Sequence, residues 1–223
     1  MVERLVVYRA STVSGTMAAW AVRMAYPGHE TVFKSHCASD EAPPSLRELP
    51  RGCEVIFLET CAPSADWLVA CCKRFRWVYV WDHHTASAAI ATSFASLNST
   101  NVVVNSNTGQ LLNMKPLNLS LRIERYMTGC MIACRELNVQ LSPKQRALFA
   151  LVQDYELGIH LHPRSRQFGL AMRSRSIEGR IELNPYLFSQ LAALDPDQLL
   201  SEDHHPKEDG PSDWEDHPGK ETE

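Results

Sequence analysis

Short apolar runs alternate with amphipathic or alanine-rich stretches along the first half of the chain. Apolar runs bounded by polar and turn-forming residues predict strands that are buried on both faces, and the longer stretches between them predict helices. This alternation favours an α/β fold with a doubly wound, mainly parallel sheet flanked by helices. The expected strands are Leu5–Tyr8, Thr31–Phe33, Cys53–Glu59, Trp77–Trp81 and Val102–Val104, and the expected helices are Gly15–Ala25, Pro63–Phe75 and Ala86–Leu97.

The alternation loosens after residue 105. Asn105–Pro116 is polar and is predicted to be a loop, whereas Leu119–Glu124 is predicted to be one further strand. The segments that follow have helical patterns, and one of them starts with a serine and a proline in the order that favours a helix N-terminus. The expected helices are Gly129–Leu137, Ser142–Tyr155, Gln167–Arg175 and Pro185–Ala193.

The end of the chain differs in composition from the rest. Residues 1–198 are expected to form the α/β domain, with the core sheet in 1–105 and an additional strand and helices in 106–198. Beyond Asp195 the sequence is acidic and contains few large apolar residues. Such a segment buries too little apolar surface to offset the entropy lost on ordering, so residues 199–223 are predicted to be an acidic, disordered tail.

The charge of the chain is unevenly distributed. The formal net charge is −4, and residues 201–223 contain nine acids and two lysines, which gives this segment −7. The remaining residues therefore carry about +3. Neither charge is large enough to predict nucleic-acid binding.

The cysteines and the apolar runs bear on the cellular compartment. The seven cysteines are odd in number and lie mostly inside apolar runs, which is typical of buried, reduced thiols in an intracellular protein. No signal peptide or clear transit peptide is expected from the first residues, and no apolar run is long enough to span a membrane. The sequence predicts a cytoplasmic protein without membrane contact.

Candidate chemistry follows two of the predicted strands. Glu59 ends one strand, and Asp82, His83 and His84 follow the next. Ligands of open α/β sheets bind at the carboxyl ends of the strands, and parallel strands bring these ends to one edge. Carboxylate and imidazole together suit Mn, Fe or Zn. The alternative is that the Asp-His-His run is an ordinary polar loop.

Four segments follow one another in a recognisable order. They are Val6–Trp20, Ile56–Pro63, Asp82–His84, and Val152–Leu157 together with Ala171–Arg175. In this order they resemble the motifs of the DHH phosphoesterase superfamily, which includes single-strand exonucleases, nucleotide and oligoribonucleotide phosphatases, and family II inorganic pyrophosphatases. The Asp-His-His run resembles the motif that gives the superfamily its name, and the second motif normally ends its strand in Asp rather than Glu.

The resemblance implies a hydrolase site with two Mn-type ions that hold a phosphate and activate a water. When the roles of the superfamily's motif residues are transferred to the matching positions of this chain, three kinds of residue are implied: metal ligands, catalytic residues and phosphate contacts. The implied metal ligands are Glu59, His83 and Asp154, the implied catalytic residues are Asp82 and His84, and the implied phosphate contacts are Arg9 and Arg173.

The first motif departs from the superfamily pattern. Arg9 stands where the superfamily has a metal-ligating His, and Ala10–Ser14 contains no acid. A guanidinium has no lone pair for a metal ion and repels it. The resemblance therefore implies one Mn²⁺ or other divalent ion, or no ion at all. No further substrate-binding domain with a glycine-rich motif is evident after the fourth motif.

Two functions remain open on this basis. The first is a catalytically impaired protein of DHH type that acts as a binding or assembly partner in a protein complex. The second is a residual metal-dependent phosphoesterase that hydrolyses short oligonucleotides, nucleotides or phosphoanhydrides. Both allow a short nucleotide or a phosphate as ligand.

Overall fold

The computed structural model describes residues 2–28, 30–36, 46, 49–60, 64–97, 103–105, 110–112 and 118–174. The helix predicted at Pro185–Ala193 and the predicted acidic tail lie outside the described residues. No helix in the described part of the chain combines the length and the apolar character needed to cross a membrane.

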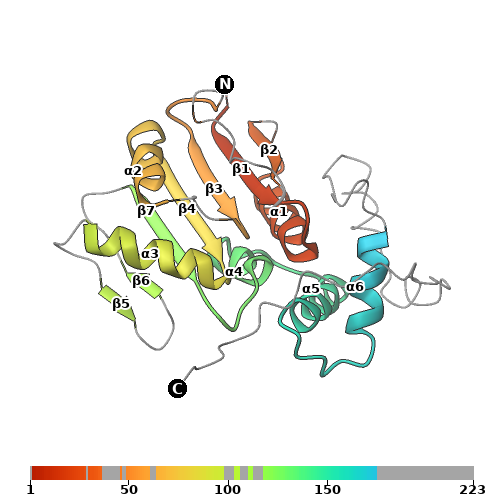
Figure 1. Ribbon diagram of the computed structural model, residues 1–223. Coiled ribbons are helices and arrows are strands. Elements are labelled where there is room, and N and C mark those ends of the chain that lie inside the picture. Colours follow the sequence, from red (N-terminus) through yellow and green to blue (C-terminus); the bar gives the residue numbers. More distant parts are fainter. Residues whose placement is uncertain are drawn as a thin grey trace, which may run out of the picture.

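The main sheet has five strands, all parallel, in the order β2-β1-β3-β4-β7 (Figure 1). Its strands confirm the α/β architecture and the strand positions expected from the apolar runs. Because all five strands run the same way, their carboxyl ends share one edge of the sheet. The strands are β1 Arg4–Arg9, β2 Thr31–His36, β3 Glu54–Leu58, β4 Trp77–Asp82 and β7 Leu119–Ile123.

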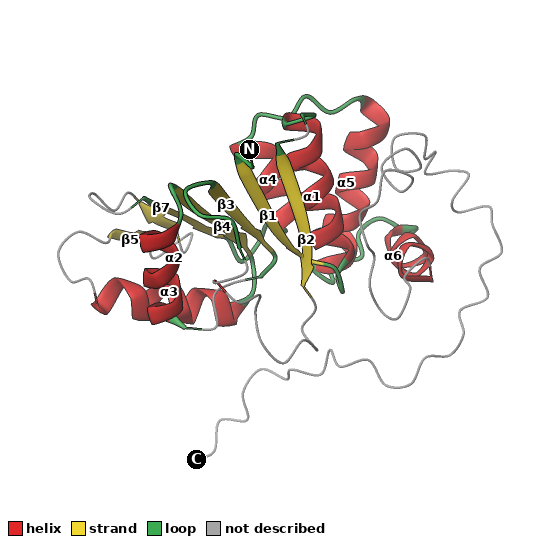
Figure 2. Ribbon diagram, turned by 90° about the horizontal axis from the view of Figure 1, so that it is seen from above, coloured by secondary structure: helices red, strands yellow, loops and turns green. Residues whose placement is uncertain are grey.

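Helices cover both faces of this sheet (Figure 2). Successive strand side chains point to opposite faces, so Val6 and Ile56 belong to one apolar cluster and Leu5 and Val55 to another. The first cluster is closed by α1 (Val13–Ala25), α4 (Gly129–Glu136) and α5 (Pro143–Glu156), and the second by α2 (Ala65–Arg74) and α3 (Thr85–Leu97). The doubly wound arrangement explains why the strands lack an alternating polar pattern.

The strand predicted at Val102–Val104 does not join the main sheet. It corresponds to β5 (Val103–Asn105), which pairs antiparallel with β6 (Gln110–Leu112) in a separate two-stranded sheet. β6 also falls within Asn105–Pro116, so the prediction of a loop there is wrong in part. In the main sheet, the strand that pairs with the outer edge of β4 is β7.

Helix α6 (Ser165–Ser174) packs on α5 through a small residue. Phe168 and Met172 are buried on the same side of the helix. Between them, Gly169 lies so close to the Tyr155 ring that a Cβ atom there would overlap the ring. The close approach of α6 to α5 therefore requires glycine at this position.

We predict that Gly169→Ala destabilises the protein by about 1–3 kcal/mol, because the added methyl group forces α6 away from Tyr155. Gln167→Ala is the matched control, since Gln167 is exposed on the same helix, and it should change stability by less than about 0.5 kcal/mol. Urea denaturation measures both. Equal stability of the two variants would contradict this account of the α5–α6 contact.

Candidate functional site

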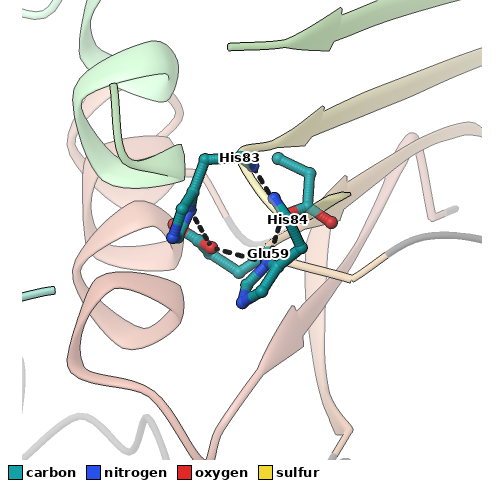
Figure 3. Close-up of side chains that lie close together, drawn as sticks. Glu59, His83 and His84 are labelled. Carbon is teal, nitrogen blue, oxygen red and sulfur yellow. Dashed lines mark hydrogen bonds and ion pairs between the residues drawn. The ribbon is translucent and has the colours of Figure 1, made fainter. Parts of the chain in front are cut away.

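The candidate site lies beside β1 and β3, where the order in which strands are added to the sheet reverses direction. The chain passes from β1 to β2 on one side, whereas β3 continues on the other side of β1. Ligands of open α/β sheets bind at the carboxyl ends of two such strands. Arg9 ends β1, Glu59 follows directly after β3, and Asp82 ends β4. Figure 3 shows Glu59, His83 and His84 together at this edge of the sheet.

Glu59 is the most deeply buried acid of the site. Its side chain has no exposed surface, and its backbone has a φ of 55°, a left-handed conformation that is unfavourable for residues other than glycine. Oε1 accepts hydrogen bonds from the Ser14 hydroxyl and the Gly129 amide, each at 2.5 Å. A Cβ atom on Gly129 would lie 2.6 Å from Oε1, so glycine is required there.

The other oxygen of Glu59 faces His83. Glu59 Oε2 lies 2.8 Å from His83 Nδ1, but the two groups are not aligned for a hydrogen bond, and both atoms are buried without a hydrogen-bond partner. Burial acts to lower the pKa of His83, but the carboxylates of Glu59, Asp82 and Glu156 together outweigh this effect, so the pKa is raised. A buried carboxylate oxygen and an imidazole nitrogen therefore face each other as an ion pair without a hydrogen bond.

Asp82 and His84 are already engaged with their neighbours. Asp82 Oδ1 accepts from the backbone amides of His83 and His84 at 2.7 and 3.2 Å and lies 2.6 Å from His84 Nδ1. Asp82 Oδ2 accepts from the Ser87 hydroxyl. Burial acts to raise the pKa of Asp82, but the hydrogen bonds from the His84 ring, the Ser87 hydroxyl and the His84 amide outweigh burial, so the pKa is lowered. Asp82 is thus an ionised anchor for the two histidines.

Arg9 engages the remaining nitrogen of His84. Arg9 Nη1 lies 3.0 Å from His84 Nε2. Because guanidinium groups only donate, Nε2 is the acceptor and the ring proton sits on Nδ1, where it is donated to Asp82. The chain of contacts from Asp82 through His84 to Arg9 therefore uses both ring nitrogens.

The cluster could hold a metal ion. Glu59, Asp82, His83 and His84 each offer one ligand atom, and these atoms all lie within 4.8 Å of one another. Within the described ranges this is the one such group of acids, histidines and cysteines. Glu59 Oε2 and His83 Nδ1 are available without loss of a hydrogen bond. Asp82 and His84 would have to exchange existing contacts to bind an ion.

Two predicted site residues are not part of this cluster. Asp154 lies elsewhere, and the side chain of Arg173 is outside the described residues. Asp154 does not join the cluster, because its carboxylate accepts hydrogen bonds from the amides of Leu161 and His162, at 2.9 and 3.0 Å. The prediction that Asp154 is a metal ligand is therefore not supported. The side chain of Arg173 lies outside the described residues, and its predicted phosphate contact stays a prediction.

Glu156 is a residue of the site that was not predicted from the sequence. Its Oε1 accepts from the amides of Val13 and Ser14, at 2.9 and 3.2 Å, and thereby neutralises the N-terminus of α1. Its charge also raises the pKa of His83. Asp154 and Glu156 are two positions apart on one helix, so they point in nearly opposite directions. A helical projection of α5 could have shown that only one of them faces the site.

Comparisons with known proteins gave no neighbours. Neither the scan against models of protein families nor the searches of curated proteins and of solved structures found a match.

We predict a pH-dependent contribution of the Glu59–His83 pair in protein freed of metal by chelation. Because the folded-state pKa of His83 is raised, this stabilisation is fully present below the unfolded value of about 6.5 and is lost as the pH rises through the folded value. The difference in Tm between wild type and Glu59→Gln should therefore shrink with rising pH. A difference that stays constant or grows with pH would contradict the pairing.

Proposed function

We propose that the protein is a degenerate DHH-type domain that binds one divalent ion and a phosphate-bearing ligand, and that it acts as a binding or assembly partner rather than as a two-metal hydrolase. The contact between Arg9 and His84, 3.0 Å at the end of β1, carries this proposal. It puts a permanent positive charge where the resemblance to the superfamily calls for a metal-ligating histidine.

The loop after β1 offers nothing to a second ion. Ala10–Ser14 contains no carboxylate or imidazole. The Thr12 hydroxyl accepts from the Gly15 amide, and the Ser14 hydroxyl donates to Glu59. A second cation beside Arg9 would also meet a like charge at short range. Two-metal activation of a water is therefore not part of the proposal.

The charges of the site favour one cation. Glu59, Asp82 and Glu156 surround His83, and Arg9 supplies one positive charge opposite these three carboxylates. Glu59 Oε2 and His83 Nδ1 would hold the ion, a mixed oxygen and nitrogen donor set that suits Mn²⁺, Fe²⁺ or Zn²⁺. A bound ion would polarise a phosphate oxygen as a Lewis acid.

Arg9 would contact the same ligand from the side of β1. A guanidinium is planar and forms paired hydrogen bonds to phosphate oxygens. Its partial exposure leaves it accessible at the edge of the sheet. Arg9 thus supports binding of an anionic ligand, as expected from the sequence, while it removes His84 from metal ligation.

A residual phosphoesterase is the second candidate. What favours it is the pair of buried atoms without hydrogen bonds, Glu59 Oε2 and His83 Nδ1. The two atoms lie 2.8 Å apart, so an ion could bind to both without breaking a hydrogen bond. With one ion, hydrolysis of short oligonucleotides, nucleotides or phosphoanhydrides would need a substrate that completes the coordination itself.

The decisive experiment is metal analysis of the purified protein together with a Mn²⁺-dependent thermal shift. We expect one ion per chain and a rise in Tm with Mn²⁺, because a ligand that binds only the folded state stabilises it. His83→Gln should abolish both effects. His160→Asn is the matched control, since His160 is exposed and has a φ of 52°, which Asn tolerates.

Hydrolysis separates the two candidates. If the protein is a binding partner, wild type should hydrolyse dinucleotides and pyrophosphate no faster than His83→Gln does. Turnover that Mn²⁺ restores in wild type and that His83→Gln removes would establish the phosphoesterase instead. Two ions per chain, or none, would contradict the proposal.

Arg9→Gln should lower the affinity for inorganic phosphate about tenfold in the presence of Mn²⁺, because hydrogen bonds from charged groups contribute about 1.5–3 kcal/mol each. The ion stoichiometry should remain at one. Arg9→Lys keeps the positive charge but loses the paired hydrogen bonds of the guanidinium. Its phosphate affinity should therefore lie between those of the wild type and Arg9→Gln. Isothermal titration calorimetry measures these affinities, and equal phosphate binding by all three proteins would exclude Arg9 as the anion contact.

A further inference from the structure

The connection between α5 and α6 exposes large apolar side chains. Leu161 is 84% exposed, Ile159 is 49% exposed, and Leu170 on α6 is 38% exposed. Together they make up three of the six exposed large hydrophobic residues in the part of the chain that the structure describes. Single exposed apolar residues are ordinary, but three in one short stretch of the chain point to an interaction surface.

This connection is held in a fixed shape. The carboxylate of Asp154 accepts from the amides of Leu161 and His162, and its backbone carbonyl accepts from those of Ile159 and His160. His160 has a φ of 52°, which costs a residue other than glycine conformational energy. The four hydrogen bonds to Asp154 offset this cost. The loop is therefore built to hold Ile159 and Leu161 outward.

Two exposed arginines lie in the same stretch of the chain as the exposed apolar side chains. Arg164 and Arg166 are exposed, and residues 157–174 contain no acid. Arg166 and Leu170 are one turn apart on α6, on the side opposite to the buried Phe168. We call the group of Ile159, Leu161, Arg164, Arg166 and Leu170 the α5–α6 surface.

We propose that the α5–α6 surface binds the acidic segment 201–223 of the same molecule. That segment contains nine acids, two lysines and Trp214, so it offers negative charge to Arg164 and Arg166 and a large apolar side chain to Leu161. The described residues end at Ser174, the last residue of α6, and only 26 residues separate Ser174 from Ser201. Tethering at this distance raises the effective concentration of the segment at the surface.

This contact is independent of the proposed ion. None of the five residues of the α5–α6 surface belongs to the cluster of Glu59, Asp82, His83 and His84. It also gives Asp154, which the sequence suggested as a metal ligand, a different role as the positioning residue of the loop.

The test uses a fluorescent peptide of residues 201–223 and full-length receptors. In the first receptor the nine acids of this segment are replaced by Asn or Gln, so that the receptor's own segment does not compete. We expect this receptor to bind the peptide, and Leu161→Ser or Arg164→Glu/Arg166→Glu in the same background to weaken binding at least about tenfold, the effect of about 1.4 kcal/mol. Arg51→Glu is the matched control, since Arg51 is exposed outside the surface.

The second receptor is the unmodified chain. Its own segment should occupy the surface, so the peptide should bind at least about tenfold more weakly than to the first receptor. Equal binding by the two receptors would overturn the intramolecular contact, as would concentration-dependent dimerisation that requires the acids. Absence of binding to the first receptor, or an equal loss on Arg51→Glu, would overturn the surface itself. Circular dichroism confirms that each variant is folded.

Discussion

The buried carboxylate of Glu59 is the interaction on which the site and its surroundings depend. One oxygen joins the start of α1 to the start of α4, through Ser14 and Gly129. The other faces His83 at the end of the neighbouring strand. A charged group in this position must be matched by donors or by a positive charge, since an isolated buried carboxylate is very unfavourable. Three elements far apart in sequence are therefore placed by one side chain.

A second set of contacts runs beside it and determines what the site can do. Asp82 fixes the ring of His84, and His84 accepts from Arg9. The lone pair of His84 is thus used by a cation that belongs to the protein itself. What remains available to an external ion is the pair of Glu59 Oε2 and His83 Nδ1. An ion held by two protein atoms needs further ligands, so binding of the ion and of an anionic ligand should support each other.

The sequence predicted the sheet well and the site in part. The strands and most helices follow from local patterns that persist in the fold, and the gathering of Glu59, His83 and His84 follows from the parallel arrangement. The left-handed backbone of Glu59 and the choice between Asp154 and Glu156 depend on tertiary packing, which no local pattern records. β5 was misplaced because an apolar triplet does not show which strand it pairs with.

The central claim is that this edge of the sheet holds a single divalent ion between Glu59 and His83. Anomalous diffraction at the manganese edge from crystals soaked in Mn²⁺ tests it most directly. The account predicts one peak, about 2.0–2.3 Å from Glu59 Oε2 and His83 Nδ1, with Arg9 still bound to His84. Two peaks, or a peak that displaces Arg9 from His84, would contradict it, and so would the absence of any peak at this edge.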